Sequence, residues 1–296
     1  MPIPVCAEEC QHSSLTIINC DVMIAVPFML RGYQFGAVIP FALLHVACLL
    51  VFFIPFRWEY VILLAATYFL RAFGATAGYH RYFSHRSYKL SRTFQFLMAF
   101  LAQTSAQKGV LWWAAHHRYH HRHSDDENDI HSPVRAGFWW AHVGWILSNE
   151  FDKYDKRLVS DLEIYPELRW LNRYHWLASL LLGTALFAAF GFNAFLWGFV
   201  LSTVLLFHST FSINSLAHVW GHQRYETGDH SRNNLFLALI TLGEGWHNNH
   251  HKFMYSCRQG LRWWEIDVTY YVLKLLSLFG IATDLREANE WRGSQS

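Results

Sequence analysis

The sequence predicts an all-α integral membrane protein in which four transmembrane helices form two hairpins beneath a polar helical cap. Three observations lead to this fold class. Hydrophobic residues make up 53% of the 296 residues, aromatic residues 18% and charged residues only 16%, whereas soluble proteins carry about 25% charged residues. Four apolar runs approach the length that spans a bilayer. Finally, 19 histidines gather mostly in the polar stretches outside these runs.

The first predicted hairpin comprises residues 35–54 and 60–79, which are joined by a tight turn at residues 55–59. Each run is apolar over about 20 residues, which is the length of a membrane-spanning helix. The preceding residues, 1–34, contain only a short apolar stretch at 22–30. We therefore expect residues 1–34 to be an N-terminal cytoplasmic segment and residues 35–296 to form a single membrane-bound domain.

The second predicted hairpin comprises residues 174–192 and 195–216, with the break after Asn193. Two shorter apolar runs, 93–106 and 268–282, fit helices that lie in the membrane interface. Residues 109–172 and 218–267 are polar and rich in histidine, so we expect them outside the lipid. They would form the helical cap.

Charge sets the expected orientation. Of the 24 lysines and arginines, only Arg57 falls in the turns opposite the cap, and only Arg71 falls within a span. The positive-inside rule then places the cap and both termini in the cytoplasm, as in a multi-pass protein of a bacterial inner membrane or of the endoplasmic reticulum. The net charge of +2 gives no sign of a nucleic-acid partner.

Four blocks of histidines are the candidate metal-binding residues. Two of them have the pattern His-x-x-His-His, in which the three imidazoles share one helical face and can converge on one point. The other two blocks follow the second and fourth spans, so all four are expected at one membrane surface. Two His-x-x-His-His blocks arise by chance with a probability of only about 0.003 at this histidine frequency, which disfavours a set of ordinary surface histidines. The nine imidazoles are those of His80, His85, His117, His120, His121, His218, His247, His250 and His251.

Nine imidazoles exceed the four ligands of one tetrahedral zinc ion, so they indicate two metal ions. Imidazole suits zinc, copper, iron and nickel. Neutral ligands also leave coordination positions open, which favours oxygen activation by iron. The cap is thus predicted to hold a histidine-rich centre with two metals. The remaining ten histidines are expected to orient these ligands or to lie at the surface, and His208 to line a cavity within the fourth span.

These blocks resemble those of the membrane-bound fatty acyl desaturases of the stearoyl-CoA Δ9 type, in the version found in bacterial members. The resemblance runs from about Thr76 to Leu285. It rests on TAGYHR at 76–81, SHRSYK at 84–89, HRYHH at 117–121, HVGW at 142–145, NSLAH at 214–218 and GEGWH at 243–247.

The resemblance implies a di-iron centre with O2 as co-substrate, in which the nine histidines bind two iron ions and Asn214 binds one of them through a water. No catalytic residue is expected apart from this centre. The resemblance also implies a bent tunnel for a saturated C16–C18 acyl chain, carried by coenzyme A, that receives a cis double bond at Δ9. Electrons would come from a separate ferredoxin or cytochrome b5 with its reductase. Five residues match tunnel positions: Gln107, Trp113 and Thr210 near the metals, and Tyr68 and Ala72 at the closed end.

The sequence differs from the animal acyl-CoA pattern at one place, and it leaves an alternative substrate and an alternative enzyme open. Animal acyl-CoA members carry a basic pair after the Gly-Trp-Ile/Leu-Leu segment, whereas here Ser148, Asn149 and Glu150 follow Leu147. A phosphate-rich coenzyme A prefers Arg or Lys there, so a lipid-linked or carrier-protein-linked chain is the alternative substrate. A related di-iron hydroxylase or ketolase is the alternative enzyme. A metal transporter would need more ionisable residues in its spans.

Overall fold

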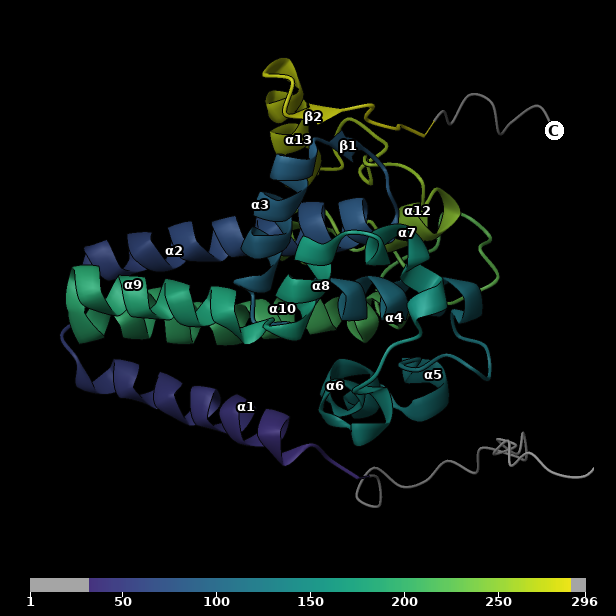
Figure 1. Cartoon of the computed structure of the whole chain (residues 1–296). Helices are drawn as coiled ribbons and strands as arrows, with labels where there is room; N and C mark the ends of the chain where they lie inside the picture. The colour runs from purple at the N-terminus through teal and green to yellow at the C-terminus, as the bar shows by residue number, and fades with distance from the viewer. Residues whose placement is uncertain (1–31, 289–296) are drawn as a thin grey trace, which may run out of the picture. The chain divides into compact units, whose positions relative to one another are not determined.

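A computed structural model describes residues 32–288, so most of the predicted N-terminal segment, residues 1–34, lies outside the described residues. The described chain is largely helical, as predicted (Figure 1). A two-stranded antiparallel ladder, β1 (Lys89–Leu90) with β2 (Ala282–Thr283), is the one sheet among these residues.

The first apolar helix, α1 (Phe35–Cys48), continues as the 3-10 helix Leu49–Phe53 and coincides with the predicted run 35–54. None of its residues is buried against the protein. Polar contacts attach it at two places: the Gln34 amide N–H donates to the Leu147 carbonyl at 2.9 Å, and the Nε2 atoms of His45 and His208 lie 2.9 Å apart. An apolar helix with no buried face is suited to contact with lipid.

The second apolar helix is longer than predicted. Helix α2 (Trp58–Phe73) continues without a break as the π-helix Gly74–Ser84, and all residues of the π-helix are buried. Gly74 packs on helix α3 (Arg92–Gln103), because a Cβ at Gly74 would lie 2.9 Å from the Leu101 carbonyl group. The buried π-helix thus extends the apolar helix to His80 and Arg81.

Arg71 is fully buried in this helix. Its Nε donates to the Thr104 carbonyl at 2.9 Å, and its terminal nitrogens donate to Ser202 Oγ at 3.1 Å and Thr203 Oγ1 at 2.7 Å. Arg71 therefore ties α2 to the end of α3 and to the start of α10 (Ser202–Asn214).

The third apolar segment runs from Trp176 to His218 and is folded at Gly191. It comprises α9 (Trp176–Phe195), the π-helix Leu196–Leu201, α10 and a 3-10 turn, Leu216–His218. Gly191 has φ 79° and ψ −178°, a conformation accessible almost only to glycine. The two arms lie side by side (Figure 1), with the rings of Phe187 and Phe195 6.1 Å apart. The chain thus reverses at Gly191, two residues before the predicted break at Asn193.

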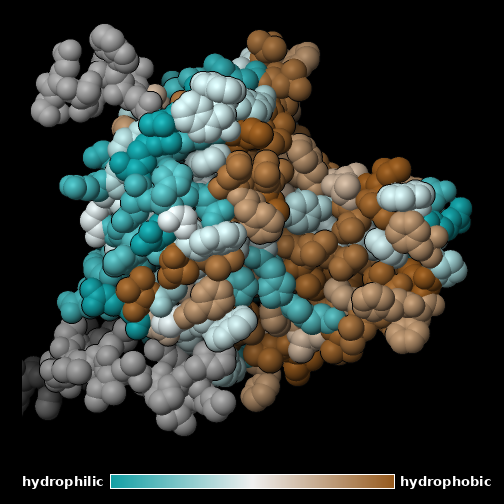
Figure 2. All heavy atoms as spheres, turned by 180° about the vertical axis from the view of Figure 1, so that it is seen from behind, coloured by the Kyte–Doolittle hydropathy of each residue, from teal (hydrophilic) through white to brown (hydrophobic). Residues whose placement is uncertain are grey.

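Three helical segments of the described chain are long and apolar enough to cross a membrane: Phe35–Phe53, Trp58–Ser84 and Trp176–His218. They indicate membrane association. Figure 2 shows hydrophobic side chains gathered over one part of the surface and hydrophilic side chains over another. This division matches the predicted apolar spans and polar cap.

The polar part contains mostly short helices. Two of them present histidines, namely α4 (Val110–His123) and α12 (His247–Lys252). The predicted interfacial helices correspond to α3 and to α13 (Val268–Leu278). The remaining elements are α5 (Pro133–Ala136), a π-turn at Trp140–Gly144, α6 (Trp145–Leu147), 3-10 turns at Asn149–Phe151 and Lys156–Val159, α7 (Ser160–Glu163), α8 (Pro166–Arg173) and α11 (Leu235–Ile240).

Candidate metal centre

Helix α4 carries the first His-x-x-His-His block as predicted. The Asn172 side-chain oxygen accepts from the amides of Leu111 and Trp112, both at 3.0 Å, and so satisfies two free N–H groups of the first turn. His117, His120 and His121 follow in the last turns of the helix.

Helix α12 carries the second block, and its two asparagines hold it in place. The amides of Asn248 and Asn249 both donate to Asn233 Oδ1, at 3.0 and 3.1 Å. The Asn249 side chain donates to Glu265, and the Asn248 side chain donates to the Tyr225 carbonyl. All five residues from His247 to His251 are buried, so the orientation of the three imidazoles is set by surrounding protein.

The structure gathers five imidazoles into one group, here called the five-histidine group. The Nε2 atoms of His85 and His117 are 2.8 Å apart, and His250 Nε2 lies 3.0 Å from both His80 Nε2 and His121 Nε2. One nitrogen from each residue lies within 4.8 Å of the others. The group consists of His80, His85, His117, His121 and His250.

The other four predicted imidazoles form a second group, here called the four-histidine group. His247 Nε2 lies 3.1 Å from the Nε2 atoms of both His218 and His251. All four residues are buried, and their ligating nitrogens also lie within 4.8 Å of one another. The group consists of His120, His218, His247 and His251.

Each His-x-x-His-His block is divided between the two groups, contrary to the expectation that its three imidazoles converge on one point. On α4, His117 and His121 face the five-histidine group and His120 faces the other. On α12 the roles reverse, with His247 and His251 in the four-histidine group and His250 in the five-histidine group. Residues i and i+4 lie nearly above one another, whereas i+3 is displaced around the helix, so two helices can share two sites.

The donor set fits two transition-metal ions. A neutral imidazole has one N–H, yet His250 Nε2 and His247 Nε2 each face two other imidazole nitrogens at 3.0–3.1 Å. Hydrogen bonds alone do not satisfy all these nitrogens, whereas a bound cation at the centre of each group would.

Burial favours the neutral form of six of the nine imidazoles, and the neutral imidazole is the form that binds metal. Burial first, and neighbouring imidazoles second, hold the pKa of His85, His117 and His121 well below the usual range. The same causes act on His247 and His250.

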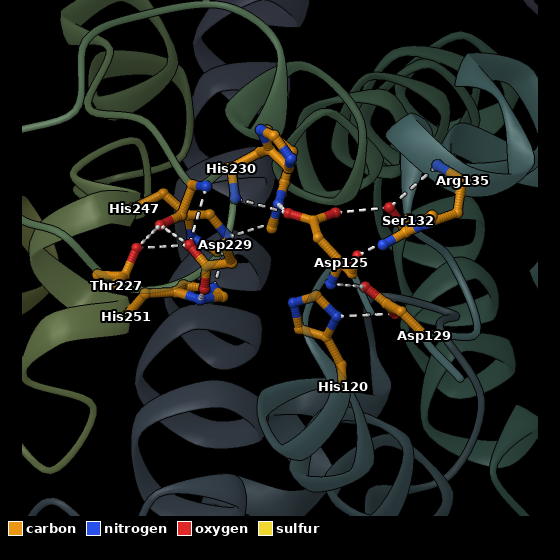
Figure 3. Close-up of polar contacts among 12 residues, drawn as sticks. His120, Asp125, Asp129, Ser132, Arg135, Thr227, Asp229, His230, His247 and His251 are labelled. Carbon is orange, nitrogen blue, oxygen red and sulfur yellow. Dashed lines mark hydrogen bonds and ion pairs between the residues drawn. The ribbon is translucent and has the colours of Figure 1, made fainter. Parts of the chain in front are cut away.

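Four carboxylates stand behind the imidazoles, and Figure 3 shows three of them, from Asp125, Asp129 and Asp229. Nδ1 atoms of the four-histidine group face Asp129 from His120 at 3.0 Å, Asp125 from His218 at 2.7 Å and Asp229 from His251 at 2.5 Å. Glu244 pairs with His80 Nδ1 of the five-histidine group and with Arg81, which is also bonded to Asp267. Such partners orient a ligating imidazole and raise its basicity.

The carboxylates remain charged in this setting. Burial alone would raise the pKa of Asp125, but the hydrogen bond and charge of His218 outweigh it, so the pKa lies below the usual range. Asp129 and Asp229 behave alike, because His120 and His251 lower their pKa values. Burial is likewise outweighed at Glu244, where His80 and Arg81 lower the pKa to about 2.

A central cavity of about 500 Å³ adjoins the histidines. Three of the predicted tunnel residues line it, and the Gln107 side-chain amide donates to Thr210 Oγ1 at 3.0 Å. Asn214, expected to contact a metal through water, lines the same cavity. The lining near the histidine groups includes Gln107, Trp113, His117, Thr210, Phe211 and Asn214.

The two residues predicted at the closed end of the tunnel lie elsewhere. Ala72 belongs to the hydrophobic core, and the Tyr68 hydroxyl donates to the Ile240 carbonyl at 2.6 Å. Neither is among the described residues that line the central cavity. Their role at the end of a tunnel stays a prediction.

Sequence reasoning missed the four carboxylates, and it singled out no role for His131. The His131 ring stacks on His120 with centroids 4.3 Å apart and also lines the central cavity. His208 bonds to both His45 and His142, in keeping with a role inside the protein. A signal was present for the first two carboxylates, because Asp125 and Asp129 closely follow the histidines of α4.

Comparisons with known proteins agree with this geometry. The sequence model of the fatty acid desaturase family matches residues 56–276. An acyl-CoA 5-desaturase of Anemone leveillei is 40% identical over 253 residues, which cover 83% of this chain and 78% of the relative. A palmitoyl-monogalactosyldiacylglycerol delta-7 desaturase of Arabidopsis thaliana is 38% identical over 264 residues, covering 88% and 71%. An sn-1 stearoyl-lipid 9-desaturase of Anabaena variabilis is 35% identical over 251 residues, covering 83% and 92%.

Proposed function

The chain belongs to the fatty acid desaturase family, and we propose that it is an oxygen-dependent di-iron enzyme that introduces a cis double bond at Δ9 into a saturated C16–C18 acyl chain. The observation that carries this proposal is the convergence of nine imidazoles in two groups beside an apolar cavity. Iron bound by the two groups would supply the activation of O2 and the removal of two hydrogens from adjacent methylenes. In this proposal Asn214 binds one iron through a water.

The protein's own contribution is to position the chain. The Gln107–Thr210 hydrogen bond lies beside the histidines and limits where a chain can bend. Trp113 stacks between the rings of Tyr79 and His117, at 5.4 and 4.9 Å, and so supports a flat apolar wall next to a ligand. We propose that these walls select the pair of carbons, and that Tyr68 and Ala72 limit the chain length.

We further propose a multi-pass topology with four crossings. The third apolar segment folds back at Gly191, so it can cross twice and return the chain to the side of the cap. Arg57 is the one Lys or Arg in the two turns opposite the histidine-rich segments, which are residues 54–57 and the reversal at Gly191. This distribution supports a cytoplasmic cap and cytoplasmic termini. The membrane would be a bacterial inner membrane or the endoplasmic reticulum, with residues 35–296 as one catalytic domain.

The reaction also requires two electrons from a partner. We propose an external ferredoxin or cytochrome b5 with its reductase. Lysines and arginines of the cap would attract an acidic donor.

Acyl-CoA is the carrier that the sequence resemblance favours, and a lipid-linked chain is the second candidate. One observation supports the second. Lys108 is the one Lys or Arg among the described residues lining the central cavity, and its Nζ lies 3.1 Å from both Asp152 and Gln34 Oε1. A neutralised lysine offers little attraction to the phosphates of coenzyme A.

Expression in a desaturase-deficient host tests the reaction. We expect new cis-monounsaturated C16 and C18 chains, detected by mass spectrometry as a loss of two hydrogens. The His120→Ala variant, expressed at the same level, should form none. A product that gains one oxygen would instead identify a hydroxylase, and a zinc-filled protein without product would exclude an iron oxidase.

A further inference from the structure

A second apolar depression lies beside the central cavity, between α9 and the π-helix Leu196–Leu201. This feature, here called the α9 groove, has a volume of about 600 Å³ and is lined almost entirely by apolar side chains. It begins at Trp176 and extends to Phe187. A sequence separation of eleven residues corresponds to about 16 Å of helix, close to half of the roughly 30 Å hydrocarbon core of a bilayer. The groove therefore matches the depth of one lipid leaflet.

Gly183 leaves space at the base of the groove because it has no side chain. A Cβ at this position would lie 3.3 Å from ring carbons of both Phe195 and Phe199, which is tighter than an ordinary contact. On the rim, Leu180 and Thr184 are exposed to the surroundings. The groove is thus a shallow channel with an aromatic wall and an open side toward the lipid.

The groove and the central cavity share a wall. Trp176, Ser179 and Phe199 line both. His175 and the Lys108–Asp152 ion pair line the central cavity at the same end as Trp176. Tryptophan at the start of a membrane helix commonly marks the level of the lipid headgroups. Two apolar channels therefore adjoin each other along this wall, with polar groups beside its Trp176 end.

We propose that the substrate is a diacyl lipid, whose reacting chain enters the central cavity and whose second chain lies in the α9 groove. This inference rests on the proposed function and adds the chemical class of the substrate. Two adjoining apolar channels with polar groups beside one end suit two acyl chains that are joined at a glycerol. The polar lining there is an ion pair with a histidine, which suits a neutral or zwitterionic headgroup more than a polyanionic one.

Three substrates and three variants test this inference. The substrates are 1-stearoyl-2-palmitoyl-phosphatidylcholine, 1-stearoyl-lysophosphatidylcholine and stearoyl-CoA, each given to the full-length iron-loaded protein in detergent micelles with its reducing system. Thr184→Trp and Leu180→Trp fill the groove from its exposed rim, so neither disturbs the core. Ala185→Trp is the matched control, because Ala185 is exposed but does not line the groove.

We expect the wild type to desaturate the diacyl lipid about tenfold more efficiently than the lysolipid, by kcat/KM. Both groove-filling variants should lose most of this preference, since the bulky ring replaces contacts that the second chain would make. The control should keep it.

Other outcomes overturn the inference in distinguishable ways. Equal use of diacyl lipid and lysolipid by the wild type contradicts the groove but leaves the desaturase proposal intact. A preference unchanged in both variants identifies the groove as a site for bulk lipid only. A shift to shorter chains on the lysolipid in the variants places the end of the reacting chain there instead. Conversion of none of the three substrates contradicts the proposed function itself.

Discussion

The two histidine groups share the helices α4 and α12 but differ in what stands behind their imidazoles. In the four-histidine group, three of four imidazoles face a carboxylate of their own, from Asp125, Asp129 and Asp229. In the five-histidine group, Glu244 is the one carboxylate paired with an imidazole among the described residues, and Arg81 shares it. The four-histidine group gains basicity and negative charge from these carboxylates. The five-histidine group has fewer carboxylate partners and offers a metal ion one more imidazole nitrogen instead. The two metals would therefore not be equivalent.

The largest effect is expected from His120→Ala, which removes one imidazole of the four-histidine group. Activity should fall by more than about a thousandfold, because a group with three remaining imidazoles holds its metal poorly. Bound metal, measured by inductively coupled plasma mass spectrometry, should drop from two ions to about one. His123→Ala on the same helix is the control, since its ring pairs with Asp126 outside both groups. Full activity in His120→Ala would exclude His120 as a ligand.

Glu244→Gln should lower the stability of the protein more than the corresponding substitution of Asp125, Asp129 or Asp229. Glu244 holds both His80 and the buried Arg81, so the amide leaves Arg81 with Asp267 as its remaining acidic partner. Loss of one partner of a buried ion pair costs about 3–5 kcal/mol. Thermal unfolding of the metal-free variant should show a lower Tm than Asp229→Asn. An equal Tm for the two variants would refute the dual role of Glu244.

Asp125→Asn should weaken metal binding with a smaller change in stability. The carboxylate accepts from His218, from Ser132 and from the His230 amide. Removal of such a partner lowers metal affinity by about 10–100-fold. Competition with a chelator should release one metal ion early from Asp125→Asn, whereas Asp126→Asn should match the wild type. Retention of both ions at the wild-type chelator concentration would show that His218 needs no carboxylate.

The smallest effect concerns the pH dependence of the metal-free protein. The pKa values of His85, His117 and His121 lie well below the unfolded value of about 6.5, mainly through burial. The unfolded chain then binds more protons than the folded chain below pH 6.5, so stability falls as the pH falls. Differential scanning calorimetry should show Tm lower by roughly 5 °C at pH 5 than at pH 7. A Tm that rises on acidification would contradict the burial of neutral imidazoles.

The gathering of the nine histidines could be predicted from sequence, but their division could not. Periodicity places His117, His120 and His121 on one face of a helix. Whether that face meets one metal or two depends on the position of α12, and α12 lies more than a hundred residues later in the chain. The role of carboxylates such as Asp229 could not be predicted either, because an aspartate in a polar loop can also lie in contact with solvent or cap a turn.

The membrane segments show a similar limit. The length of the apolar runs predicts the positions of the helices well, and the predicted break at Asn193 lies only two residues from the observed reversal at Gly191. The continuation of the second apolar helix beyond the predicted end at residue 79 could not be predicted, because His80 and Arg81 are polar and find their partner Glu244 only through tertiary contacts.

The buried position of Arg71 has a consequence for how the chain is inserted into a membrane. Two of its oxygen partners, Ser202 and Thr203, are synthesised about 130 residues after it, as the sequence separations of 131 and 132 show. A guanidinium inside a lipid bilayer is costly until such oxygens surround it. The first hairpin should consequently remain at the insertion machinery until the last one emerges, so that the helices integrate together and not one by one.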